Sequence, residues 1–138
     1  MALWLLRLFI LTVVLLTLDA VWLISMNEWL YRRELGEILL NGFRIVPALL
    51  FYMIYVLGVG HFVLRPALEA NNLALALRQG AFFGFVCYAT YDLTNYATLK
   101  VWSPLVTSLD MAWGTILTST AATVTFLICR RFAPLKKV

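Results

Sequence analysis

The chain has 138 residues, of which 63% are hydrophobic and 13% charged, and its formal net charge is +4. This composition, with a mean hydropathy of +0.89, excludes a soluble globular domain and is typical of an integral membrane protein. The basic excess predicts no nucleic-acid partner, because four of the eleven basic residues stand beside an apolar segment at the C-terminus, as membrane-anchoring residues do: Arg130, Arg131, Lys136 and Lys137.

Charged residues divide the sequence into four apolar segments, each long enough as a helix to cross about 30 Å of hydrocarbon. We predict one all-α transmembrane domain over residues 1–138, an integral membrane bundle of four transmembrane helices with spans at about 5–27, 45–65, 74–99 and 104–129. Leu18-Asp19-Ala20 stands where a secretory signal would have a small-residue cleavage site, so the first segment is expected to remain as a helix.

The connections differ in length and character. Residues 28–44 carry apolar residues at helical spacing with charges opposite, which predicts a short interfacial helix or an ordered loop between the first two spans. Asn71 and Asn72 mark a turn and the start of the third helix. Ser103 followed by Pro104 is typical of a helix N-terminus, and the short connection before it predicts that the third and fourth helices are antiparallel neighbours.

Basic residues predict the orientation in the membrane. With four spans, the N-terminus, the second connection and the C-terminal tail share one side and hold seven basic residues, whereas the other side holds four that are diluted by glutamates. The excess favours the cytoplasmic side of the membrane for both termini.

Three spans contain an aspartate, and all three lie at a similar depth. Asp19 is nine residues before Glu28, Asp92 eight before Lys100, and Asp110 six after Pro104. At about 1.5 Å per residue, each lies roughly 9 to 13 Å below the outer end of its helix. Because an ionisable group in hydrocarbon is costly, this layer predicts a buried polar site on converging helix faces.

Helical spacing adds four side chains to these faces. Asn95 and Tyr88 share a stripe with Asp92 on the third helix, Trp22 follows Asp19 on the first, and Trp113 follows Asp110 on the fourth. The predicted ligand-binding residues are therefore seven: Asp19, Asp92, Asp110, Asn95, Tyr88, Trp22 and Trp113.

Several kinds of chemistry suit this set. Carboxylates crowded in a low dielectric cannot all ionise, so one is expected to hold a proton near neutral pH, as proton coupling or general acid catalysis needs. A hard cation suits oxygen ligands, and an amine suits carboxylates beside aromatic rings. In a third arrangement Lys100 or Arg44 neutralises a carboxylate, and the polar groups serve only to hold the helices together.

Other features carry less functional information. One histidine, His61, cannot form the paired histidines of zinc or di-iron sites, and we expect it near the inner face, away from the acids. Cys87 and Cys129 fall within spans, so no disulfide or metal site is predicted. The Gly80-x-x-x-Gly84 pattern indicates close helix packing, either within the bundle or in a homodimer.

Three sequence strings resemble a known family. They are Leu18-Asp19-Ala20-Val21-Trp22-Leu23, Tyr91-Asp92-Leu93-Thr94-Asn95-Tyr96 and Asp110-Met111-Ala112-Trp113-Gly114-Thr115. Together they resemble a bacterial family of predicted membrane proteins, domain of unknown function 2177, over essentially the whole chain. The resemblance implies a four-span inner-membrane protein of about this size and supplies no reaction, ligand or cofactor.

The leading hypothesis is binding or translocation of a proton, a cation or an amine-bearing small ligand in the outer half of the bilayer. One alternative is a membrane-embedded enzyme that acts on a lipid or isoprenoid by carboxylate acid/base chemistry, and another is a non-catalytic membrane partner protein. The sequence contains no nucleophile elbow or phosphate-binding glycine loop, and it identifies neither catalytic residues nor a cofactor. Membrane lipids are the expected partners.

Overall fold

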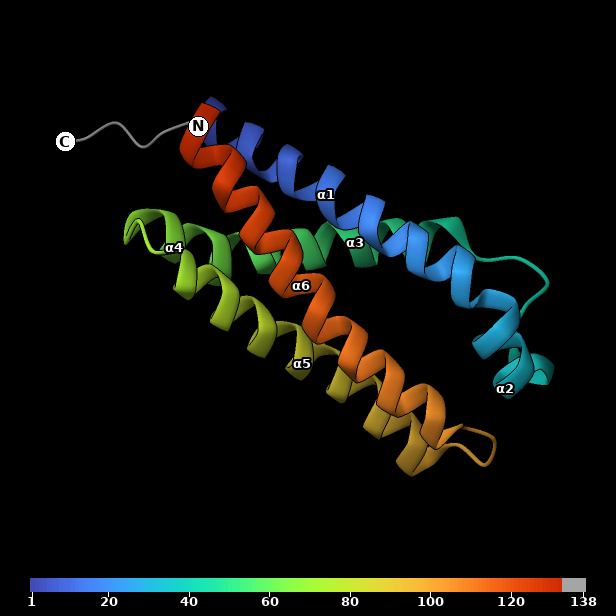
Figure 1. Ribbon diagram of the computed structural model, residues 1–138. Helices are drawn as coiled ribbons and strands as arrows, with labels where there is room; N and C mark the ends of the chain where they lie inside the picture. Colours follow the sequence, from blue (N-terminus) through green and yellow to red (C-terminus); the bar gives the residue numbers. More distant parts are fainter. Residues whose placement is uncertain (133–138) are drawn as a thin grey trace.

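Four long helices make up most of the computed structural model, which describes residues 1–132 apart from the side chain of Glu37 (Figure 1). Each is long and apolar enough to cross a membrane, and the predicted four-helix membrane bundle is confirmed. In chain order the elements are α1 (Ala2–Met26), η1 (Asn27–Arg32), α2 (Arg33–Leu35), η2 (Gly36–Ile38), α3 (Ile45–Val59), η3 (Gly60–Leu64), α4 (Arg65–Glu69), α5 (Leu73–Thr98) and α6 (Pro104–Phe132).

Two of the spans contain a π-helical turn. The turn η1 continues α1 into α2, so the first span is helical from Ala2 to Leu35, and η3 continues α3 into α4, so the second runs from Ile45 to Glu69. The connection for which we predicted an interfacial helix or a loop thus begins as an extension of the first span. It bends toward the start of α6 (Figure 1). A π-helical turn changes the helix direction and the faces that follow it.

Local sequence signals explain where α5 and α6 begin. The Asn72 side chain accepts a hydrogen bond from the backbone N–H of Leu75 at 3.2 Å, and Asn71 before it has a φ of 48°, which asparagine tolerates well. The Ser103 hydroxyl accepts from the backbone N–H of Leu105 at 3.2 Å. The same hydroxyl donates to Glu34 at 2.7 Å, so the cap of α6 also fixes the extension of the first span.

Glycines bring α5 and α6 into close contact along their length (Figure 1). A Cβ added to Gly84 would collide with the backbone carbonyl of Gly114, and one added to Gly80 would lie 2.9 Å from the Cα of Ser119. The small-residue pattern on α5 is therefore used within the bundle. The ring of Tyr88 lies against Gly114, which gives this tyrosine a fixed position beside α6.

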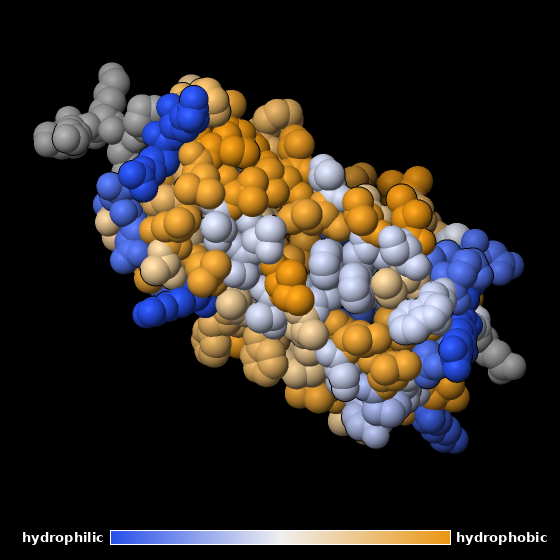
Figure 2. All heavy atoms as spheres, viewed as in Figure 1, coloured by the Kyte–Doolittle hydropathy of each residue, from blue (hydrophilic) through white to orange (hydrophobic). Residues whose placement is uncertain are grey.

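The apolar core is concentrated in the half of the bundle that contains the start of α1 and the end of α6. Leu11, Val59, Leu64, Leu117 and Phe126 are among its fully buried members and come from all the spans but α5, which adds Ala76. A smaller cluster of Leu30, Leu35 and Val106 joins the opposite end, where α2 meets α6. Hydrophilic residues gather at the two ends of the surface, with a mostly hydrophobic region between them (Figure 2), as expected for a chain that crosses a bilayer.

Candidate functional site

Asp19 joins three helices through its two carboxylate oxygens. Oδ1 accepts a hydrogen bond from the indole N–H of Trp113 on α6 at 3.0 Å, and Oδ2 accepts from the hydroxyl of Tyr52 on α3 at 2.6 Å. The residue is 5% exposed. Neutral donors thus satisfy the carboxylate, which is how buried polar groups are accommodated in a bundle.

Asp110 on α6 is held by the extension of the first span. Its Oδ1 accepts a hydrogen bond from the hydroxyl of Tyr31 at 2.5 Å, and that hydroxyl accepts in turn from the indole N–H of Trp22 at 2.9 Å. In a regular α-helix two residues nine positions apart point about 180° away from each other. The π-helical turn η1 begins after Trp22, at Asn27, and contains Tyr31; it redirects the chain so that the two side chains meet.

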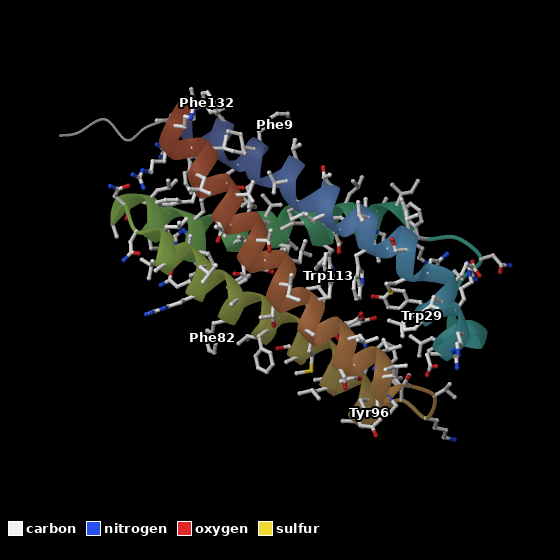
Figure 3. All side chains as sticks on the ribbon, viewed as in Figure 1. Phe9, Trp29, Phe82, Tyr96, Trp113 and Phe132 are labelled. Atoms are coloured by element: carbon white, nitrogen blue, oxygen red, sulfur yellow. The ribbon has the colours of Figure 1, made fainter. Side chains whose placement is uncertain are left out.

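A pair of stacked indoles connects the two carboxylates. The rings of Trp22 and Trp113 lie 4.5 Å apart between centroids with an angle of 6° between their planes. Trp113 points from α6 into the space between α6 and α1, whereas Phe9 and Phe82 point outward (Figure 3). The stack and its hydrogen bonds form one continuous network from Asp19 to Asp110.

These groups line a cavity of about 520 Å³, a volume typical of small-molecule sites. All four spans contribute to its wall, and eight of its twelve lining residues are aromatic. No lysine, arginine or histidine is among these lining residues, so the only formal charges in the wall belong to the two aspartates. The full lining is Asp19, Trp22, Leu23, Tyr31, Phe51, Tyr52, Tyr55, Cys87, Tyr88, Tyr91, Asp110 and Trp113.

The cavity occupies the region where α3 and α5 separate. The two helices meet at η3 and diverge toward the other end of the bundle (Figure 1). The ring of Tyr55 bridges them, with centroids 5.9 Å from Phe83 and 6.5 Å from Tyr88. Beyond this bridge the lining residues Phe51 and Tyr91 are 47% and 60% exposed, so the cavity wall extends to the lateral surface of the bundle.

The structure brings together five of the seven predicted site residues. Asp19, Asp110, Tyr88, Trp22 and Trp113 all line the cavity. None of the three aspartates faces outward, because Asp19 is 5%, Asp92 0% and Asp110 7% exposed.

The other two predicted residues do not line the cavity. Asp92 is fully buried on α5, one helical turn after Tyr88. Within residues 1–132 neither of its oxygens has a hydrogen-bond partner. Asn95, one turn further along α5, is only half-buried. Tyr88, Asp92 and Asn95 share one face of α5, but only Tyr88 lines the cavity.

Sequence reasoning missed the contribution of the second span. Tyr52 and Tyr55 lie three residues apart on α3, and each hydroxyl engages another helix, at Asp19 and at Thr118 (2.6 Å) respectively. The sequence feature that could have identified them is the pair of tyrosines three residues apart on an apolar helix. Sequence reasoning also missed Tyr31, because a straight helix would have pointed this side chain away from Asp110, to which it donates a hydrogen bond. Leu23, Phe51, Cys87 and Tyr91 carried no distinguishing pattern.

Charge neutralisation by a basic residue is not what the structure shows. The ion pairs found in the described part of the chain join Arg32 to Glu28, Arg33 to Glu34 and Arg65 to Glu69, all at or beyond the ends of the bundle. Lys100 and Arg44 are exposed and pair with none of the aspartates. His61 is also exposed, in edge-to-face contact with Phe62 and away from the cavity.

No group of three or more histidine, cysteine, aspartate or glutamate side chains comes together among the described residues in an arrangement suited to a metal ion. Cys87 and Cys129 are both free thiols. The side chains that line the cavity supply carboxylates, phenols, indoles and the thiol of Cys87.

Comparison with known proteins gives one match. No curated protein and no solved structure matches the chain. A family described as "Predicted membrane protein (DUF2177)" matches residues 4–127, a range that includes every residue lining the cavity. The chain therefore belongs to this family of predicted membrane proteins.

Proposed function

We propose that the protein binds a small organic cation, an amine or a related positively charged group, in the cavity between its four spans. The observation that carries this proposal is the charge of the wall: two buried aspartates, eight aromatic residues and no basic side chain. Carboxylates in a region of low dielectric favour a neighbouring positive charge, and aromatic faces attract cations. A cation is thus the ligand that best complements this lining.

The packing supports binding over translocation by a single chain. Between the cavity and the end of the bundle that holds the start of α1 and the end of α6, most of the interior is filled by buried apolar residues such as Leu15, Val59, Val63 and Leu117. A continuous polar route across the bundle would have to pass through this largely apolar core, which is costly for an ion. A proton or cation translocation path would therefore need a rearranged bundle or a second copy of the chain.

The proposed setting is a bacterial cytoplasmic membrane with both termini inside and the cavity in the outer half. Seven basic residues on the terminal side against four on the other support this orientation. Two of the seven, Lys136 and Lys137, lie outside the described residues.

One observation favours an enzymatic alternative. The hydroxyl of Tyr31 and the carboxylate of Asp110 form a short hydrogen bond at the cavity wall, and such a pair can exchange a proton with a bound group. The lateral exposure of Phe51 and Tyr91 is compatible with a lipid-like substrate. Consumption of a bound lipid or isoprenoid by the purified protein would favour this alternative over simple binding.

The test is calorimetric titration of the protein in lipid nanodiscs with two short cations, hexylamine and hexyltrimethylammonium, against empty nanodiscs. We expect at least one cation to bind, and hexanol and hexanoate to bind not at all. Asp19→Asn and Asp110→Asn should each weaken binding by about tenfold or more, because each removes one of the two charges in the wall.

A matched control is Glu28→Gln. Glu28 is an exposed carboxylate at the same end of the bundle, but it is paired with Arg32 outside the cavity. This variant should bind as the unmodified protein does. If neither cation binds, or if all three variants lose affinity equally, the cation-binding function is wrong.

A further inference from the structure

We propose that the cavity selects a quaternary ammonium group, carried on an uncharged apolar chain that leaves the bundle between α3 and α5. This inference rests on the proposed function and specifies the chemical class of its ligand. It follows from the hydrogen bonds that the polar atoms of the cavity wall already make within the protein.

The hydrogen-bond donors of the wall are largely engaged inside the protein. The indole N–H groups of Trp22 and Trp113 donate to Tyr31 and Asp19, and the hydroxyls of Tyr31 and Tyr52 donate to Asp110 and Asp19. The Tyr55 hydroxyl donates to Thr118, because the hydroxyl of Thr118 itself donates to the carbonyl of Gly114. Five aromatic residues therefore present mainly their ring faces to a ligand.

Part of the acceptor capacity of the two aspartates is also used inside the protein. Both oxygens of Asp19 accept hydrogen bonds, and so does one oxygen of Asp110. A primary ammonium has three N–H donors that each need an acceptor when water is excluded. A quaternary ammonium has none, so it gains the attraction of both carboxylates without leaving a donor unsatisfied.

The aromatic wall suits such a group. The stacked indoles of Trp22 and Trp113 each keep one face free of the other, and Phe51 lies beside Tyr52 and Tyr55 with centroids 5.0 and 5.4 Å away. Enclosure by several aromatic rings is the arrangement by which proteins recognise quaternary ammonium groups. The charges of Asp19 and Asp110 add a longer-range attraction.

The rest of the ligand is inferred from the shape and charge of the cavity. Its wall reaches the lateral surface at Phe51 on α3 and Tyr91 on α5, both of them exposed, so an alkyl chain leaves between these helices directly into the bilayer. A phosphate next to the ammonium would have no lysine or arginine among the lining residues and would lie near two carboxylates. The structure thus favours an alkylammonium over a phosphocholine head group.

The test compares four hexyl probes by calorimetry on the protein in nanodiscs: hexyltrimethylammonium, hexylamine, hexylphosphocholine and hexanol. We expect hexyltrimethylammonium to bind about tenfold tighter than hexylamine, with no binding of the other two. Equal or tighter binding of hexylamine would overturn the quaternary ammonium inference and leave cation binding intact. Binding of hexylphosphocholine as tight as that of hexyltrimethylammonium would overturn the inferred exclusion of phosphate. If neither cation binds, the proposed cation-binding function itself is wrong.

A pair of variants at one position isolates the contribution of the ring faces. Trp22→Phe and Trp22→Leu both lose the hydrogen bond to Tyr31, but only the phenylalanine keeps an aromatic face toward the ligand. The leucine variant should lose about tenfold more affinity for hexyltrimethylammonium than the phenylalanine variant. Trp29→Leu, at an exposed tryptophan outside the cavity, should have no effect. Equal losses at Trp22 would contradict recognition by aromatic faces, and if both Trp22 variants fail to fold, the probe series on the unmodified protein still decides.

Discussion

At the scale of single residues, the three buried aspartates differ in their partners. Asp19 accepts hydrogen bonds from Trp113 and Tyr52, and Asp110 accepts one from Tyr31, whereas Asp92 accepts none within the described residues. The sequence groups the three aspartates by their predicted depth along the helices. The hydrogen-bond donors come from other spans, so the spacing of residues within one helix does not predict which donor binds which carboxylate.

Tyr31 offers a direct test of the network. Tyr31→Phe removes the hydroxyl that donates to Asp110 and accepts from Trp22, and leaves a buried carboxylate and an indole N–H without these partners. We expect the free energy of unfolding in detergent to fall by about 0.5–2 kcal/mol. Chemical denaturation followed by circular dichroism measures the change.

The control for this prediction is Tyr96→Phe, at an exposed tyrosine on α5 that does not line the cavity. It should change stability by less than about 0.5 kcal/mol. Equal losses in the two variants would mean that the hydroxyl of Tyr31 contributes nothing specific.

At the scale of helices, the hairpin of α5 and α6 fixes one side of the cavity. Its close approach depends on Gly84 and Gly80, whose missing side chains leave room for the backbone of α6. Gly114 likewise leaves room for the ring of Tyr88, which then stands in the cavity wall. The choice between packing in the bundle and packing in a dimer could not be made from the pattern alone, since both use the same small residues.

Gly84→Ala tests the closeness of this hairpin. The added methyl group would meet the carbonyl of Gly114, which belongs to a helix backbone and cannot rotate away. We expect a loss of about 1–3 kcal/mol in the free energy of unfolding, as for other overpacked interiors. Equilibrium unfolding in detergent provides the measurement.

Gly42→Ala is the matched control, because an added Cβ there has no atom within 4 Å. Its stability should match that of the unmodified protein. A Gly84→Ala variant as stable as Gly42→Ala would show that α5 and α6 can separate without cost.

At the scale of the whole molecule, the bundle has two unlike halves. The half with the start of α1 and the end of α6 is filled mainly by apolar side chains from every span. The other half contains the cavity, and at that end α2 packs against α6. Because the two halves differ, the orientation of the chain in the membrane decides which leaflet the cavity faces.

The predicted orientation can be measured with single cysteines in a background where Cys87 and Cys129 are replaced by alanine. Asn41→Cys lies in the connection after η2, and Ala70→Cys lies in the turn before α5, at opposite ends of the bundle. A membrane-impermeant maleimide should label Asn41→Cys in cells with a permeabilised outer membrane, and Ala70→Cys only after lysis. The reverse pattern would place the cavity in the inner half of the bilayer.

The sequence by itself determined the class of the protein, because hydropathy and charge are summed along the chain and need no tertiary contact. It also predicted that Asp19, Asp92 and Asp110 lie at similar depth, since helix rise converts residue number into distance. Tertiary structure alone decided which of them share a cavity. That outcome depends on the π-helical turn that redirects Tyr31, on the divergence of α3 from α5 and on the glycines of the α5 and α6 hairpin, which set helix directions that periodicity does not encode.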